Sequence, residues 1–121
     1  MSNQELAPPP APPFATGGPW IVLSGQVGVD DQWRPVTTSF EDEARAAFSN
    51  VMHHLASTSA DKSAIVKVTA YLSDFAYFDA YNAVWVEVFG DSAPARTTIQ
   101  AGLHPPFNVE LDVLAYVADR V

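Results

Sequence analysis

Arg96 is the residue of this sequence whose type and position most favour chemistry. It lies in the apolar, β-prone run Pro-Ala-Arg-Thr-Thr-Ile-Gln of residues 94–100, and an acidic run at residues 109–113 follows it. A guanidinium stays charged at physiological pH, and its planar set of donors fits a carboxylate bidentately. Arg96 is therefore a candidate clamp for an anionic substrate. The alternative is an arginine at a strand edge that pairs with a neighbouring acid.

More polar groups fall on the strands expected around this arginine. With the side-chain period of two, Thr98 shares the face of Arg96, while Glu110 and Asp112 share one face of the next strand. If the two faces coincide, Arg96 would hold a substrate carboxylate, Thr98 would add a hydroxyl contact, and Glu110 would hold or partly deprotonate a water. The alternative for Glu110 is a salt bridge to Arg96 or a place on a solvated sheet face.

A second polar stretch, Ser24-Gly25-Gln26, directly follows a buried strand expected at residues 20–24. Glycine leaves room for a ligand to approach the backbone closely. Ser24 is expected to donate a hydrogen bond rather than act as a nucleophile, because the sequence has no Ser-His-Asp arrangement and no glycine-flanked nucleophile elbow. The alternative is an ordinary turn at the end of a strand.

The sequence predicts neither a metal site nor a cofactor. His53 and His54 are neighbours on an expected helix and point apart, and His104 lies in a loop. The absence of cysteine excludes disulfides and thiolate ligands. No glycine-rich phosphate loop or other cofactor motif occurs.

Hydrophobic periodicity predicts an α+β domain with the element order ββαβαββ. The pattern Thr38-Ser39-Phe40-Glu41 has the form of a capping box and is expected to begin the first helix. Right-handed crossovers place both helices on one face of a mixed sheet, so a second copy of the chain is the simplest cover for the other face. The expected strands are 20–24, 33–37, 64–72, 95–101 and 108–119, and the expected helices are 38–57 and 75–89.

Composition bounds the partners and the location of the protein. The chain has 121 residues, of which 48% are hydrophobic and 17% charged, and its net charge is −8. We expect an extended, proline-rich arm at residues 1–18 and one domain at 19–121 that hides surplus apolar surface in an oligomer. The acidic balance opposes binding to nucleic acid or to an anionic membrane. Without an export signal or a membrane-spanning apolar run, a cytoplasmic location is expected.

Ordered motifs along most of the chain resemble those of the RidA/YjgF family of reactive-intermediate deaminases. Residues 24–26 resemble the family's Ser-Gly-Gln, and residues 65–74 resemble its Val-Lys-x-Thr-Val-Phe-Leu-x-Asp run. Aromatic residues and an asparagine within 78–89 are similar to its second helix. Residues 94–97 resemble its Pro-Ala-Arg-Ser signature, and residues 109–112 resemble its Ile-Glu-Ile-Glu strand.

The resemblance implies a chorismate-mutase-like α+β fold and a homotrimer with active-site clefts between subunits. It also implies cofactor-free hydrolysis of 2-imino acids or their enamine tautomers, such as 2-aminoacrylate or 2-iminopropionate, to 2-oxo acids and ammonia. By motif position, Arg96 is the carboxylate clamp and Glu110 is the acid that positions a water. The remaining pocket contacts by motif position are Ser24, Gly25, Asn82 and Thr98.

This sequence departs from the family pattern at several positions. No tyrosine precedes Tyr71, so the hydroxyl that many members supply from a Gly-Pro-Tyr segment is missing, and Phe14 is expected to fill its space. Thr98 stands where a cysteine is common, and residues 104–107 replace the usual loop. These departures imply an altered substrate or a reduced deaminase rate. The main alternative from another functional class is a non-catalytic trimer that binds small carboxylates, as a sensor or interaction module. The net charge of −8 opposes a third reading, RNA cleavage.

Overall fold

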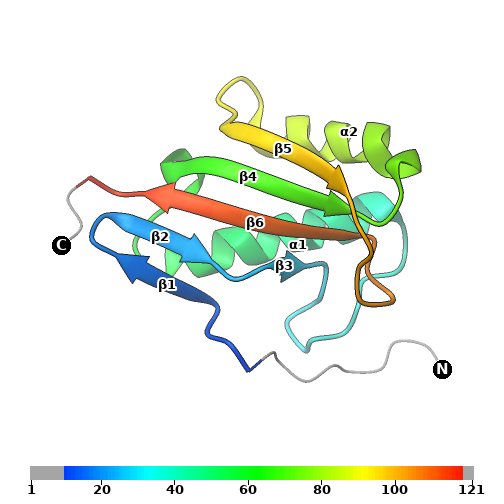
Figure 1. Ribbon diagram of the computed structural model, residues 1–121, viewed down its shortest axis with the longest axis horizontal. Coiled ribbons are helices and arrows are strands. Elements are labelled where there is room, and N and C mark those ends of the chain that lie inside the picture. The colour runs from blue at the N-terminus through cyan, green and yellow to red at the C-terminus, as the bar shows by residue number, and fades with distance from the viewer. Residues whose placement is uncertain (1–9, 119–121) are drawn as a thin grey trace.

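A computed structural model describes residues 10–118, which form a six-stranded sheet and two long helices (Figure 1). The order across the sheet is β1-β2-β6-β4-β5, and the short β3 also pairs with β6. β4 and β5 are parallel, and the other pairs are antiparallel. The predicted α+β class with a mixed sheet is confirmed. The strands are β1 (Phe14–Gly17), β2 (Trp20–Leu23), β3 (Gln26–Val27), β4 (Ile65–Leu72), β5 (Ala95–Gln100) and β6 (Val109–Tyr116).

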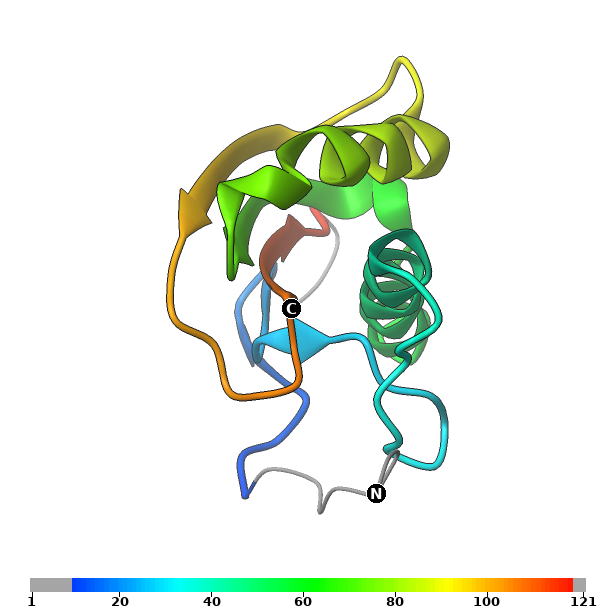
Figure 2. The same ribbon diagram turned by 90° about the vertical axis from the view of Figure 1, so that its right-hand side faces the viewer.

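Helices α1 (Phe40–Ala56) and α2 (Phe78–Phe89) lie on the same side of the sheet (Figure 2). Ser39 caps α1, because its side-chain oxygen accepts a hydrogen bond from the backbone N–H of Asp42. This cap lies one residue after the one that the Thr38-to-Glu41 pattern predicts. Two short 3₁₀ helices, η1 (Lys62–Ala64) and η2 (Phe75–Tyr77), precede β4 and α2.

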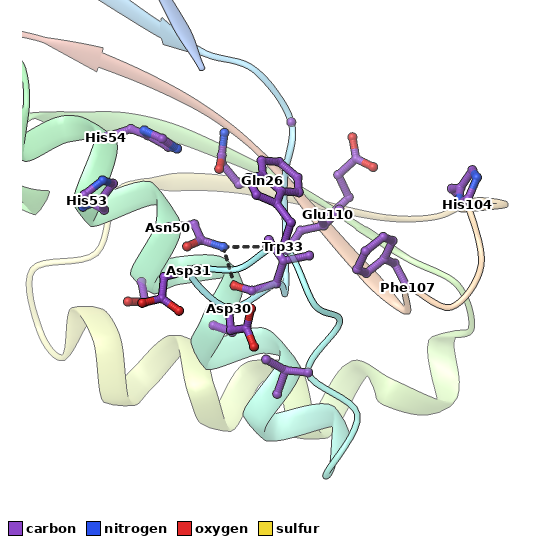
Figure 3. Close-up of a pocket in the computed structure, with 16 residues that line it drawn as sticks. Gln26, Asp30, Asp31, Trp33, Asn50, His53, His54, His104, Phe107 and Glu110 are labelled. Carbon is purple, nitrogen blue, oxygen red and sulfur yellow. Dashed lines mark hydrogen bonds between the residues drawn. The ribbon is translucent and has the colours of Figure 1, made fainter. Parts of the chain in front are cut away.

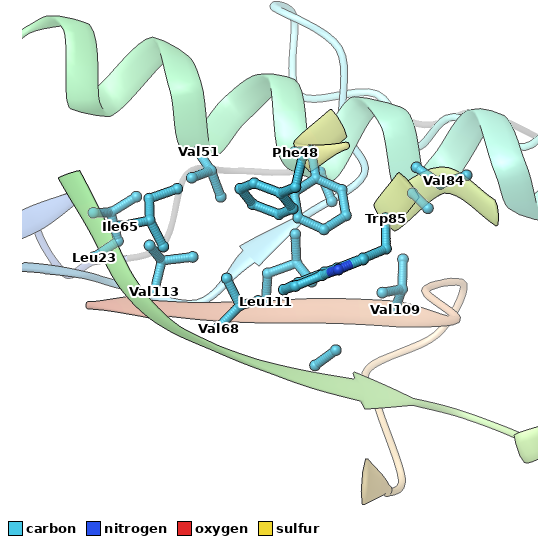
Figure 4. Close-up of a cluster of buried hydrophobic side chains, with 14 of the residues drawn as sticks. Leu23, Phe48, Val51, Ile65, Val68, Val84, Trp85, Val109, Leu111 and Val113 are labelled. Carbon is cyan, nitrogen blue, oxygen red and sulfur yellow. The ribbon is translucent and has the colours of Figure 1, made fainter. Parts of the chain in front are cut away.

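The hydrophobic core lies between the helices and one face of the sheet (Figure 4). Phe48 of α1 and Trp85 of α2 meet Leu111 of β6 there, and each of the three is buried. Side chains along β6 alternate, so that Val109 and Leu111 are buried in the core while Glu110 between them is only half-buried. Glu110 therefore points to the opposite face of the sheet.

That opposite face carries large apolar side chains that stay partly exposed. Trp20, Val22 and Tyr116 are 40%, 49% and 42% exposed. They are neighbours in the register of β2 and β6, and the Trp20 and Tyr116 rings lie 4.9 Å apart. Within residues 10–118, no helix covers this face (Figure 2). An exposed apolar patch of this kind is typical of a surface that a partner covers.

The N-terminal part differs from the sequence prediction. The strand expected at residues 33–37 is wrong: only an isolated bridge joins Val29 to Pro35, and Trp33 has a positive φ of 61°. Part of the expected extended arm, Phe14–Gly17, instead forms β1 and pairs with β2. Gly18, with φ of 55°, allows the tight reversal between these strands. Residues 1–9 of the expected arm lie outside the described residues.

Candidate functional site

Arg96 lies on β5, on the face of the sheet that the helices cover. It is in register with Val68 of β4, which is fully buried in the core. The guanidinium carbon lies 5.1 Å from the ring centroid of Trp85, 5.7 Å from that of Tyr81 and 5.8 Å from that of Phe78. All three rings come from α2, whose helical spacing turns them toward β5.

A neutral side chain holds the guanidinium in this position. Arg96 Nη2 donates a hydrogen bond of 2.6 Å to Asn82 Oδ1. Among residues 10–118, the ion pairs belong to another arginine, Arg45, and none involves Arg96. The alternative in which Arg96 pairs with a neighbouring acid is therefore wrong for this part of the chain. Its charge is oriented by an amide and three rings and remains available to an anion.

Two buried hydroxyls near Arg96 have no hydrogen-bond partner within the described residues: Thr98 Oγ1 and Tyr81 Oη. Thr98 follows Arg96 by two residues and shares its face of β5, in register with Ala70. Burial is the main cause that raises the pKa of Tyr81, against a smaller opposite effect of the Arg96 charge. The phenol therefore stays protonated and can donate. Arg96, Asn82 and Thr98 form what we call the arginine half-site.

Glu110 lies on the other face of the sheet, beside Gly25. In register it faces Val27 of β3 and Tyr71 of β4. A side chain at position 25 would overlap Glu110 Oε2, so glycine is required there for the carboxylate to lie against the backbone. Gly25 of the predicted Ser-Gly-Gln motif therefore lies beside Glu110, the predicted acid. Ser24, Gly25 and Glu110 form what we call the glutamate half-site.

The glutamate half-site is a locally acidic surface. Burial raises the pKa of Glu110, and the neighbouring Asp112 charge raises it further. Tyr71 donates a hydrogen bond of 2.9 Å to Asp112 Oδ2, which raises the pKa of the phenol. A carboxylate with a raised pKa is a stronger proton acceptor than an ordinary one, as a general base for water requires.

The two half-sites do not meet within one chain. The prediction of a pocket between the last two strands required Arg96 and Glu110 to share a face, and they lie on opposite faces. β6 lies inside the sheet and β5 at its edge, with β4 between them. The alternative of a salt bridge between Glu110 and Arg96 is wrong as well. A site that uses both residues requires two copies of the chain.

Ser24 and Phe14 take places that differ from the expected substrate contacts. Ser24 Oγ donates a hydrogen bond of 2.6 Å to the Pro12 carbonyl, and Ser24 N donates one of 2.9 Å to the Pro13 carbonyl. The serine thus ties residues 12–13 to the end of β2. Phe14 lies in register with Leu23 and packs against the hydrophobic core. Within one chain it is not among the rings around Arg96.

A cavity of about 830 Å³ continues from the glutamate half-site toward α1 (Figure 3). Gly25 and Glu110 line it, together with Trp33 and Phe107. Asn50 of α1 donates hydrogen bonds of 3.0 Å each to the Val27 and Val29 carbonyls and so fixes one wall. Sequence reasoning missed this cavity, because the wrong strand at residues 33–37 assigned Trp33 to a sheet.

Glu43 is another residue whose place the sequence did not reveal. It lies in the first turn of α1, where the helix dipole favours an acidic residue, but it is only 5% exposed. Its Oε2 accepts hydrogen bonds from the backbone N–H groups of Asn108, at 2.7 Å, and Val109, at 3.2 Å. Burial raises its pKa, and these bonds partly oppose the shift. Glu43 thereby anchors the start of β6, two residues before Glu110.

Comparison with known proteins decides the family. The family described as endoribonuclease L-PSP matches residues 7–117. The chain belongs to the RidA/YjgF family. It is 35% identical to 2-iminobutanoate/2-iminopropanoate deaminase of Dermatophagoides farinae, over 80% of this chain and 79% of that protein. It is 34% identical to the protein of the same name from Capra hircus, over 78% of this chain and 71% of that protein.

Solved structures of two other proteins share the fold of this chain. RidA from an Antarctic Psychrobacter superposes with a TM-score of 0.85 at 23% identity and covers 97% of this chain and 99% of that one. Yeast MMF1 superposes with a TM-score of 0.86 at 26% identity, over 96% of this chain and 94% of that one. Neither helix within residues 10–118 meets the length and hydropathy of a membrane span. The same residues contain no group of three or more histidine or acidic side chains that could hold a metal ion.

Proposed function

We propose that this protein is a cofactor-independent deaminase that hydrolyses 2-imino acids or their enamine tautomers to 2-oxo acids and ammonia. The observation that carries the proposal is the guanidinium of Arg96, which forms no ion pair within residues 10–118 and which Asn82 and three aromatic rings hold in place. A fixed cation of this kind suits a small carboxylate. Relatives at 34% and 35% identity bear the name 2-iminobutanoate/2-iminopropanoate deaminase, which supports the class of substrate.

The active unit in this proposal is a homotrimer with the site between subunits. Arg96 and Glu110 lie on opposite faces of one sheet, so the arginine half-site of one copy must meet the glutamate half-site of another. The partly exposed apolar face around Trp20, Val22 and Tyr116 supports association. In this trimer, Phe14 forms one wall of the site, and a neighbouring copy of the chain completes the site.

In the proposed reaction, Arg96 binds the substrate carboxylate through two parallel hydrogen bonds. Thr98 supplies a further donor. Glu110 accepts a proton from a water as the water oxygen attacks C2 of the imine, and this proton then passes to the imine nitrogen. In the resulting carbinolamine, the hydroxyl proton moves by way of Glu110 to the amino group, the C2–N bond breaks, and ammonia leaves as the carbonyl forms. An imine is already electrophilic, so this sequence of steps uses no cofactor.

The arginine half-site alone favours a second candidate, a non-catalytic protein that binds small carboxylates. Arg96 and its supports belong to a single chain and hold an available charge without Glu110. Such a protein would bind 2-oxo acids and leave imines unchanged. A cytoplasmic location and the absence of nucleic-acid and membrane partners remain predictions, and one relative, yeast MMF1, bears a mitochondrial name.

Loss of a 2-imino acid that an amino-acid oxidase generates in situ tests the proposal. We expect the wild-type protein to accelerate this loss, and Glu110→Gln to reduce kcat by about 10²- to 10⁴-fold, as removal of a general base does. Binding of a 2-oxo acid should be largely retained. Glu41→Gln, the same change in the first turn of α1, is the matched control. Binding without hydrolysis by the wild type would favour the carboxylate-binding candidate instead.

A further inference from the structure

Trp33 holds a backbone conformation that suits glycine. Its φ is 61°, in the left-handed region that bulky residues rarely adopt. It ends a turn in which Trp33 N donates a hydrogen bond of 3.0 Å to the Asp30 carbonyl and Asp30 N donates one of 2.9 Å to the Arg34 carbonyl. Glycine is the common residue at such a position of a hairpin loop. The indole is half-buried and lies outside the core cluster, so core packing does not explain it.

The Trp33 indole lines the cavity of about 830 Å³ that continues to Glu110 (Figure 3). Phe107, Val27 and Val29 contribute apolar walls, and Gly25 lies at the same end as Glu110. The volume falls in the range of about 300–1,000 Å³ that ligand pockets occupy. It is much larger than a three-carbon imino acid requires.

The protein itself already uses several polar groups around this cavity. Asn50 Nδ2 donates to two backbone carbonyls, and Gln26 Nε2 donates to the Ser24 carbonyl at 2.8 Å. Asp30 Oδ1 accepts hydrogen bonds from the backbone N–H groups of Gln32 and Arg34. The surface left for a ligand near Glu110 is therefore mainly the rings and branched side chains, which favour an apolar group with a flat face.

We propose that Trp33 and Phe107 form a subsite for the side chain of the substrate, and that the preferred substrates are 2-imino acids with an aromatic or bulky apolar side chain. This rests on the proposed deaminase function. The reacting carbon lies at Glu110, and the side chain extends from it along the cavity against the indole. Tryptophan stands at this position, in spite of the backbone strain, because its indole contacts the substrate.

The experiment compares imines generated by an amino-acid oxidase from phenylalanine and from alanine. For the wild type, we expect kcat/KM to be at least tenfold higher for the phenylalanine-derived imine. Trp33→Gly should reduce this ratio at least tenfold, and Trp33→Phe should restore most of it. Gln32→Ala, an exposed position in the same turn, is the matched control. Trp33→Gly should also melt at a higher temperature than Trp33→Ala, because only glycine relieves the backbone strain.

Calorimetric binding of phenylpyruvate and pyruvate separates this proposal from the deaminase function. If imines are hydrolysed but Trp33→Gly leaves the ratio unchanged, or the wild type favours the alanine-derived imine, the subsite is refuted and the deaminase stands. If no imine is hydrolysed but phenylpyruvate binds at least tenfold more tightly and Trp33→Gly abolishes that preference, the subsite stands and the deaminase is refuted. Without hydrolysis and without a binding preference, both are refuted.

Discussion

Replacing Arg96 with lysine should impair the protein almost as severely as replacing it with alanine. Lysine keeps the positive charge and the attraction of the aromatic rings, but an ammonium cannot form two parallel hydrogen bonds to one carboxylate. Lysine also cannot reproduce the orientation that the 2.6 Å bond from Nη2 to Asn82 Oδ1 imposes on the guanidinium. Geometry rather than charge should therefore dominate the loss.

The magnitude follows from the surroundings of the guanidinium. Three rings with centroids 5.1 to 5.8 Å away exclude water from much of its surface. In such a site, loss of the charge-assisted pair should cost about 2–4 kcal/mol of transition-state binding, which is about a 30- to 1,000-fold fall in kcat/KM. The kcat/KM of Arg96→Lys should lie within about tenfold of that of Arg96→Ala. The lost ring contacts should lower the free energy of unfolding of Arg96→Ala by only about 1 kcal/mol.

The assay is imine loss with a small and a bulky substrate, alongside thermal unfolding of each variant. Arg34→Lys and Arg34→Ala are the matched controls, because Arg34 is exposed and its backbone N–H and carbonyl form hydrogen bonds with Asp30. Both controls should keep wild-type kcat/KM. Hydrolysis by folded Arg96→Ala within threefold of the wild type would refute the clamp. Full activity of Arg96→Lys would show that charge alone suffices.

Three further predictions concern pH, stability and assembly. Asp112→Asn removes the charge that helps raise the pKa of Glu110, so the acidic limb of the kcat–pH profile should move to lower pH; an unmoved limb would mean that Glu110 does not control it. Glu43→Gln should raise the free energy of unfolding at pH 7, because burial raises the pKa of Glu43 and disfavours its charged form. This gain should shrink as pH falls and Glu43 becomes protonated in the folded wild type. Glu43→Ala should instead lower the free energy of unfolding by about 1–3 kcal/mol, because it leaves two backbone N–H groups unpaired. Equal urea-unfolding curves for the wild type and both variants would contradict both expectations. Val22→Lys on the open sheet face should convert the proposed trimer into monomers in sedimentation and abolish turnover. Val86→Lys, at a 63%-exposed position of α2, should do neither. An active monomer would exclude a site shared between subunits.

Local patterns predicted the central elements of the fold well. The helix observed at Phe40–Ala56 and the strand observed at Ile65–Leu72 lie close to their predicted ranges. In both segments the period of apolar residues matches the period of the backbone, and a cap or a turn marks the end. The same reasoning failed at residues 33–37, where β-prone residues lie in a turn, and at Phe14–Gly17, where a proline-rich approach conceals a strand.

The sequence by itself determined the family, the α+β class and the alternation that puts Arg96 and Thr98 on one face of a strand and Glu110 on one face of another. These properties are local, because φ and ψ set the period of each element and neighbouring residues set its ends. Only the tertiary structure decided that Arg96 and Glu110 lie on opposite faces of the sheet, that Glu43 is buried, and that Trp33 lines a cavity. Those properties depend on strand order, register and the side on which the helices pack. Contacts between residues far apart in the chain set all three, and no local period encodes them.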